Sequence, residues 1–281
     1  MKKFLQIITI IIILSLVSSC SAPVSIVKKD DEKAHLSQSV ELPVLMYHQI
    51  GYGYGKTHVT PEIFEMHIVE LKSAGYNTVD IFDLYEYVTG DGELPENPIL
   101  ITFDDGYQSN IDSAYPILKK YDYKATVFVI GSLMGKSEHN GQSIIPHFST
   151  WDVDSIQGVL DVQSHGYNFH AIDGIYSPNE RRGVLRLEGE SYEDYVEAFE
   201  KDCDKMSKLL GYTPVAFSYP YGEYNEESHQ ILKNLGFIAT VTVENGINKI
   251  ERGNPDSLYN LKRYNMENET TPQQMLEMIK K

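Results

Sequence analysis

The sequence predicts an α/β fold whose strands pair in parallel, and two observations support this prediction. Short apolar runs rich in β-branched residues alternate along the chain with longer stretches whose apolar residues recur at helical spacing. This alternation is typical of strands joined by helical crossovers. In such folds the polar residues that carry chemistry follow directly after the strands, at their carboxyl ends.

The elements can be placed in order along the chain. Strands are expected at residues 43–47, 99–103, 125–130, 159–163, 215–219 and 238–243. Helices are expected at residues 61–74, 109–121, 190–210 and 226–235. Thr60 before Pro61 is a favourable N-cap with proline at the first helical position. Glycine commonly ends a helix, and three expected helices are followed by Gly75, Gly211 and Gly236. Residues 131–149 and 171–190 are expected to form loops.

The first twenty residues resemble a bacterial secretion signal. Lys2 and Lys3 precede an apolar run at residues 4–17. A transmembrane helix needs about 20 apolar residues, which is more than this run offers. Residues 17–20, Val-Ser-Ser-Cys, resemble a lipobox, whose cysteine is acylated. The alternative is an ordinary cleaved signal with an incidental cysteine. We therefore expect residues 1–20 to be a signal ending at Cys20, and the protein to be extracytoplasmic and lipid-anchored to the bacterial cell membrane.

The rest of the chain divides into a tether and one domain. Residues 21–41 are polar and charged, as in a flexible tether. Residues 42–281 suit one large domain. A net charge of −16 argues against nucleic acid or an anionic membrane surface as a partner. Apart from Cys20 only Cys203 is present, so we expect no internal disulfide and a buried thiol. We expect a monomer.

Two adjacent carboxylates follow the expected strand at residues 99–103. In a regular strand Asp104 and Asp105 would point to opposite faces. Gly106 permits a turn that lets both side chains reach the same end of the fold. Two close carboxylates repel each other unless a cation or a proton lies nearby, and a bound metal would supply that cation. The alternative is a solvated turn, for which Asp-Asp-Gly is also suitable.

A pair of histidines follows the expected strand at residues 159–163. His165 and His170 can converge on one ion if a loop joins them. Two imidazoles and a carboxylate leave coordination positions open for water and substrate, as in a catalytic metal site. The alternative is an ordinary pair of loop histidines.

Taken together, three segments resemble the motifs of the polysaccharide deacetylases, which form carbohydrate esterase family four and contain the NodB-homology domain. Residues 102–106 (Thr-Phe-Asp-Asp-Gly) match the first motif, residues 164–170 resemble the second, and residues 217–222 (Phe-Ser-Tyr-Pro-Tyr-Gly) resemble the third. The resemblance covers roughly residues 43–242, with the core motifs at 98–242. It implies a distorted (β/α)7 barrel with a groove at the carboxyl ends of the strands.

The resemblance also implies an activity and a role for each motif residue. The activity is removal of N-acetyl groups from N-acetylglucosamine in a cell-surface polysaccharide, either poly-N-acetylglucosamine or the glycan of peptidoglycan. Asp105, His165 and His170 would hold a divalent metal, with zinc first and cobalt, nickel, manganese or iron as alternatives. Asp104 would be the general base. A backbone N–H in the turn at Pro220 and Tyr221 would stabilise the oxyanion.

The sequence departs from the family pattern in three ways. Four residues separate the two histidines, where most of the family has three. Ser218 stands where the third motif usually has arginine. No histidine follows His229, so the late Leu-x-His motif that supplies the general acid is absent. Residues 43–48 (Pro-Val-Leu-Met-Tyr-His) are similar to the branch that deacetylates poly-N-acetylglucosamine. In that branch an early Tyr-His takes the acid's place, and we therefore expect His48 to be the acid.

These departures leave a second hypothesis open, a catalytically impaired glycan-binding lipoprotein on the same fold. An aspartyl-phosphate phosphatase is a weaker rival, because the histidine pair has no place in transfer through an aspartate. Among the remaining residues, Trp151 is expected to cap a helix and pack structurally. His139 and His147 are expected to be solvated. Arg263 is expected to be structural, although relatives can place a late arginine near the catalytic carboxylate.

Overall fold

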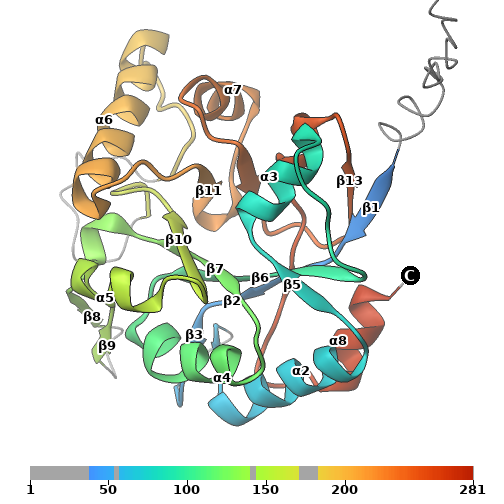
Figure 1. Ribbon diagram of the computed structural model, residues 1–281. Coiled ribbons are helices and arrows are strands. Elements are labelled where there is room, and N and C mark those ends of the chain that lie inside the picture. The colour runs from blue at the N-terminus through green and yellow to red at the C-terminus, as the bar shows by residue number, and fades with distance from the viewer. Residues whose placement is uncertain (1–37, 54–56, 140–143, 171–182, 281) are drawn as a thin grey trace, which may run out of the picture.

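A curled sheet of parallel strands forms the centre of the protein (Figure 1). The computed structural model describes residues 38–53, 57–139, 144–170 and 183–280. Along the sheet the strands are β12 (Ala239–Val241), β11 (Ala216–Ser218), β10 (Leu160–Ser164), β7 (Ala125–Val129), β6 (Pro98–Asp105), β2 (Val44–Tyr47) and β14 (Tyr264–Asn265), and β5 (Asn77–Val79) pairs with β6. The predicted signal, Cys20 and most of the tether lie outside the described residues. Within those residues, no helix is long and apolar enough to cross a membrane.

The sheet curls until its two edges are bridged by one segment near the C-terminus. Leu261 forms a parallel bridge with Val241 at the end of β12, and the Thr242 N–H donates to the Leu261 carbonyl at 2.9 Å. Three residues later the chain enters β14, which pairs in parallel with β2 on the opposite edge. The predicted α/β fold, a distorted barrel of about seven strands, is confirmed.

Helices cover the outer face of this sheet, and β6 shows why. Its residues Ile99, Ile101 and Phe103 belong to the main core, which packs against the helices, whereas Leu100 belongs to a second core inside the barrel. Successive side chains of β6 thus point alternately to the outer and the inner face of the sheet. The helices on the outer face are α2 (Pro61–Ser73), α4 (Tyr115–Lys120), α5 (Thr150–Ile156), α6 (Tyr192–Leu210), α7 (Glu226–Asn234) and α8 (Pro272–Ile279), whereas α3 (Ile81–Thr89) packs on the second core. A third core joins α6 and α7 to the outer side of β11.

The predicted helix boundaries hold where caps mark them. Thr60 caps α2 by accepting from the Ile63 N–H, and Gly211 ends α6 with a left-handed φ of 78°. The helix expected at residues 109–121 instead begins as a π-helical turn, Asn110–Ala114, before α4. Cys203 is a free thiol on α6, and burial raises its pKa to about 12.

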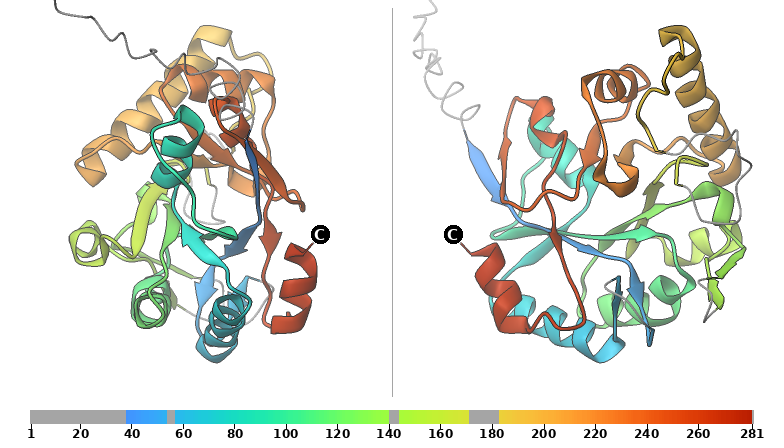
Figure 2. Two further views of the ribbon diagram at one scale, coloured as in Figure 1. Left: turned by 45° about the vertical axis from the view of Figure 1, so that its right-hand side comes forward. Right: turned by 180° about the vertical axis from the view of Figure 1, so that it is seen from behind.

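Several elements were not predicted from the sequence. The loop expected at residues 131–149 contains a short 3-10 turn, Gly131–Leu133, and a hairpin of β8 (Ser137–His139) and β9 (Ile144–Pro146). β1 (Ser39–Leu42) pairs antiparallel with β13 (Asn248–Glu251), whereas β3 (Gln49–Ile50) pairs in parallel with β4 (His58–Val59). Two further 3-10 turns cover Pro220–Gly222 and Pro255–Leu258. α8 lies beside α2, so the end of the domain packs near its beginning (Figure 2).

Candidate active site

The end of β6 turns two neighbouring carboxylates toward different partners. Asp104 keeps extended strand geometry and faces the interior of the barrel with Thr102, where both contact Arg263. Asp105 has a left-handed φ of 73° and Gly106 follows with 77°. A Cβ at Gly106 would lie only 2.8 Å from Val129 Cγ1, so this turn needs glycine for space as well as for conformation.

Asp105, His165 and His170 converge at this end of the sheet. The Nε2 atoms of His165 and His170 lie 3.6 and 3.8 Å from Asp105 Oδ1. One ligand atom from each of the three residues lies within 4.8 Å of the others. Ligand atoms about 2.0–2.2 Å from a tetrahedral metal are separated by roughly 3.3–3.6 Å, which is close to the two distances measured from Asp105 Oδ1. Four residues between the histidines, instead of three, still allow them to converge.

The donor set fits a divalent metal. Asp105 Oδ1 is buried and has no hydrogen-bond partner among the described residues, which is costly for a carboxylate oxygen without a cation. His165 donates from Nδ1 to the Ser218 carbonyl at 2.7 Å, so its Nε2 lone pair faces the centre of the triad. Burial lowers the pKa of His170 to about 4, which keeps this imidazole neutral, the form that binds metals.

Arg263 holds Asp104 from inside the barrel. Its guanidinium donates to Asp104 Oδ1 and Oδ2, each at 2.8 Å, and also to Thr102, Thr242 and Ser218. These contacts use all five N–H donors of a fully buried side chain. The sequence left the role of Arg263 open, and the structure places it on the expected catalytic carboxylate.

The pKa of Asp104 is set by two opposing effects. Burial alone would raise it, but the Arg263 guanidinium and nearby imidazoles outweigh burial and hold the pKa below its usual range. Asp104 is therefore ionised at neutral pH. Arg263 and Ser218 occupy three of roughly four acceptor positions on this carboxylate, which leaves Oδ1 able to accept a further hydrogen.

The loop that carries the two histidines is fixed by a buried carboxylate on α6. Asp202 accepts from the backbone N–H groups of Tyr167 and Asn168 at 2.8 and 2.9 Å. Phe169 packs against Phe199 of the same helix, with ring centroids 4.9 Å apart. Asp202 was missed from the sequence, although a carboxylate on the buried face of an amphipathic helix is a signal that could have found it.

His48 and Tyr221 lie on either side of this centre. His48 directly follows β2 and is close enough to Asp104 and Asp105 to lower the pKa of both carboxyls. Its Nδ1 is buried without a hydrogen-bond partner among the residues that the structure describes. Tyr221 adopts a left-handed φ of 61° directly after the buried Pro220, and its half-exposed ring lies 4.5 Å from that of His170.

Two expectations about the neighbouring loop were wrong. His147 is not solvated: its side chain is only 1 % exposed and contacts the backbone of Asp105. The hairpin of β8 and β9 buries it, which the sequence could not indicate. Trp151 does not pack structurally, because it is 90 % exposed at the start of α5, where Ser149 and Asp152 form the cap. The side chain of His139 lies outside what the structure describes.

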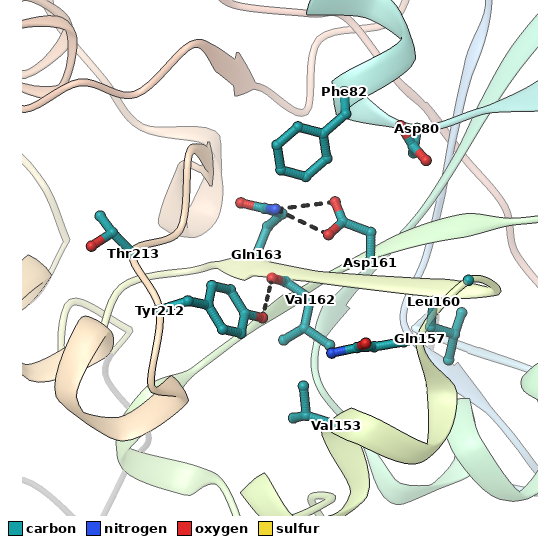
Figure 3. Close-up of a pocket in the computed structure, with 11 residues that line it drawn as sticks. Asp80, Phe82, Val153, Gln157, Leu160, Asp161, Val162, Gln163, Tyr212 and Thr213 are labelled. Atoms are coloured by element: carbon teal, nitrogen blue, oxygen red, sulfur yellow. Dashed lines mark hydrogen bonds between the residues drawn. The ribbon is translucent and has the colours of Figure 1, made fainter.

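A separate pocket of about 380 Å³ lies away from the triad (Figure 3). It occupies a gap beside β10, because β10 and β11 pair only between Ser164 and Phe217. Gln163 bridges the gap by accepting from the N–H groups of Val215 and Ala216 and by donating to Asp161. The side-chain amide of Gln163 thus has hydrogen-bond partners on both sides of the gap. None of the expected catalytic residues lines the pocket.

The fold and the site together define an α/β barrel protein with a candidate metal triad at the carboxyl ends of its strands, and the comparisons with known proteins agree. The sequence model of the polysaccharide deacetylase family matches residues 91–240. The Bacillus subtilis protein YxkH, named for the same family, is 30 % identical over 228 residues, which are 80 % of this chain and 74 % of YxkH. The chain belongs to the polysaccharide deacetylase family and is a hydrolytic deacetylase.

Two further proteins extend this comparison. The Escherichia coli poly-β-1,6-N-acetyl-D-glucosamine N-deacetylase is 29 % identical over 198 residues. These residues cover 63 % of this chain but only 30 % of the Escherichia coli protein. The structure of the Streptococcus pyogenes deacetylase PplD, at 24 % identity, covers 87 % of this chain and all of its own, with a TM-score of 0.67. That likeness supports the fold.

Proposed function

We propose that the protein is a metal-dependent N-deacetylase that removes acetyl groups from N-acetylglucosamine units of a cell-surface polysaccharide, with poly-N-acetylglucosamine favoured over peptidoglycan. The observation that carries this proposal is the convergence of Asp105, His165 and His170 beside the ionised Asp104. The substrate preference is supported by the early Tyr47-His48 pair and by relatives named for poly-N-acetylglucosamine.

The residues divide the chemistry among them. Asp105, His165 and His170 would hold the metal, for which zinc is proposed. When bound, it supplies Lewis-acid chemistry that polarises the acetamide and makes water more acidic. Asp104 takes the proton of the attacking water, and Arg263 keeps this carboxylate oriented during the transfer. The low pKa of Asp104 weakens it as a base, and the greater acidity of that water offsets this weakness.

The reaction also needs a proton for the departing amine and a hydrogen-bond donor for the oxyanion. His48, beside both aspartates, protonates the departing amine, without which an amide is a poor substrate. The backbone at Pro220 and Tyr221, held in an unusual turn, faces the triad through the Tyr221–His170 contact and would stabilise the oxyanion.

The departures that raised the alternative of an impaired glycan-binding lipoprotein have structural counterparts. Ser218 replaces the usual arginine, but Arg263 supplies a guanidinium to Asp104 from another part of the chain. The late histidine is absent, and His48 lies near both carboxylates. No observation in the described residues therefore favours loss of catalysis.

Acetate release tests the proposed activity. A fragment beginning near Ser39, which contains every described strand, is incubated with zinc or cobalt and chitin oligosaccharides, poly-N-acetylglucosamine or peptidoglycan in turn. We expect acetate from one polymer, lost with Asp104→Asn and reduced about 10²–10⁴-fold with His48→Ala. No acetate from any glycan, with metal demonstrably bound, would favour the glycan-binding alternative.

We also propose that the protein is held at the bacterial cell membrane by a lipid on Cys20. The lipobox-like residues 17–20 and the polar residues 21–41 support this proposal. A clickable fatty acid fed to expressing cells should label the wild-type chain, and Cys20→Ala should lose both the label and membrane association. Equal labelling of the two chains would contradict the anchor.

A further inference from the structure

The turn that presents Asp105 to the histidines has an unfavourable backbone. Asp105 and Gly106 are consecutive left-handed residues, with φ of 73° and 77°. A left-handed conformation is unfavourable for a residue with a side chain, and such residues persist only when the surroundings hold them. The Ile130 N–H reaches the Asp105 carbonyl only at a long 3.4 Å. Further support for the turn must come from elsewhere.

The segment after β9 supplies that support from the other side. Tyr107 and His147 form an antiparallel bridge, and the Phe148 N–H donates to the Gly106 carbonyl at 3.2 Å. His147 Nδ1 lies 3.0 Å from the Asp105 carbonyl oxygen. A carbonyl oxygen only accepts hydrogen bonds, so Nδ1 carries the hydrogen and His147 donates it.

A carboxylate on the hairpin lies behind His147. Glu138 Oε1 on β8 is 3.7 Å from His147 Nε2, and the Glu138 side chain is only 13 % exposed. The His147 ring also packs on Tyr107, with centroids 4.8 Å apart. Packing on Tyr107 thus fixes the ring plane that points Nδ1 at Asp105, while Nε2 has no hydrogen-bond partner among the described residues.

We infer that His147, packed on Tyr107, is a positioning residue for the metal centre: its Nδ1–H donates to the Asp105 carbonyl and holds the left-handed turn that points Oδ1 at His165 and His170. The inference rests on the proposed metal-dependent function. It identifies a contact outside the three sequence motifs. Groups that orient metal ligands typically contribute 10–100-fold to metal affinity, and the same factor is expected here.

Two substitutions separate the N–H donor from the bulk of the ring. In His147→Asn the side-chain amide can occupy the place of Nδ1, whereas in His147→Gln it reaches toward the place of Nε2. Zinc affinity of the full-length, metal-free chain in detergent is measured by competition with a chromophoric chelator. We expect about 10–100-fold weaker zinc binding for His147→Gln, and near wild-type affinity for His147→Asn.

The outcomes decide the inference independently of catalysis. Unchanged affinity in both variants, or equal loss in both, would overturn the role of the Nδ1 donor. If His147→Gln does not fold, His147→Leu takes its place as the variant without an N–H donor: weaker zinc binding than in His147→Asn supports the inference and equal binding overturns it. A wild-type chain that binds zinc with the expected variant pattern but releases no acetate would contradict only the proposed function. A wild-type chain that binds no zinc would contradict both.

Discussion

Asp104 and Asp105 carry the same side chain, and the backbone alone gives them different partners. Asp104 continues the strand and faces Arg263 inside the barrel, while Asp105 turns to left-handed φ and faces the two histidines. One carboxylate is therefore neutralised by a guanidinium and the other is left for a cation. This division explains how two adjacent carboxylates can both remain ionised in a buried site.

The first prediction concerns the buried pair of Arg263 and Asp104. Arg263→Met should destabilise the protein by about 3–5 kcal/mol, because it leaves Asp104 buried and unpaired. The double variant Arg263→Met/Asp104→Leu should recover most of that loss, since no charge stays behind. Urea unfolding measures both free energies.

Arg252 provides a matched control for this prediction. It is also buried, but its partner Glu93 is largely exposed, so Arg252→Met leaves no buried carboxylate. Its effect on the free energy of unfolding should therefore be smaller. Equal losses at Arg252 and Arg263, or no recovery in the double variant, would show that the buried charge is not the cause.

At the scale of elements, α6 fixes the loop that joins the two histidines. The helix would pack by its apolar stripe alone, yet Asp202 interrupts that stripe to accept from two loop N–H groups. Burial raises the pKa of Asp202 to about 6, above its value in an unfolded chain. The contribution of Asp202 to the free energy of unfolding is therefore greatest below about pH 4 and is lost as the pH rises through 6.

The second prediction follows from that pKa. Between pH 4 and 7, the unfolding free energy of metal-free wild-type protein should fall relative to Asp202→Asn by about 2–3 kcal/mol. Zinc affinity should also fall in Asp202→Asn, because asparagine has one acceptor for two loop N–H groups. Denaturant unfolding at several pH values and chelator competition measure the two effects.

Asp161 on β10 is the control for Asp202. Burial also raises its pKa to about 6, but it contacts Gln163 beside the pocket of Figure 3 and not the histidine loop. Asp161→Asn should change the pH dependence of the unfolding free energy in the same direction as Asp202→Asn does, but it should leave zinc affinity unchanged. A loss of zinc affinity in Asp161→Asn would contradict a specific role for Asp202.

Local sequence patterns predicted the fold of the protein, but they could not predict contacts between residues that lie far apart in the sequence. Asp104 directly ends one parallel strand, and the loop with His165 and His170 directly follows another. The rule that polar residues follow parallel strands therefore placed these residues at one end of the sheet. Arg263 lies 159 positions from Asp104, and only closure of the sheet joins them. His147 was assigned to solvent because its burial depends on an unpredicted hairpin.

A buried histidine ties the beginning of the domain to its end. His67 on α2 accepts from the Tyr47 hydroxyl at Nδ1 (2.9 Å) and donates from Nε2 to the Thr270 carbonyl (2.8 Å), just before α8. Since the carbonyl can only accept, the neutral tautomer is fixed. Protonation of Nδ1 would force the Tyr47 hydroxyl to accept instead of donate and would bury a charge, and burial accordingly lowers the pKa of His67.

The third prediction uses the sign of this shift. The folded pKa of His67 is below the unfolded value of about 6.5, so the unfolded chain binds the proton first and stability falls as pH drops below about 6.5. The slope contributed by His67, which is at most about 1.4 kcal/mol per pH unit, should be absent in His67→Gln. Tyr47→Phe should lower stability at neutral pH yet keep the slope, because the imidazole remains buried. Chemical unfolding of the three proteins between pH 5 and 8 tests this, and an equal slope in His67→Gln would locate the acid sensitivity in another group.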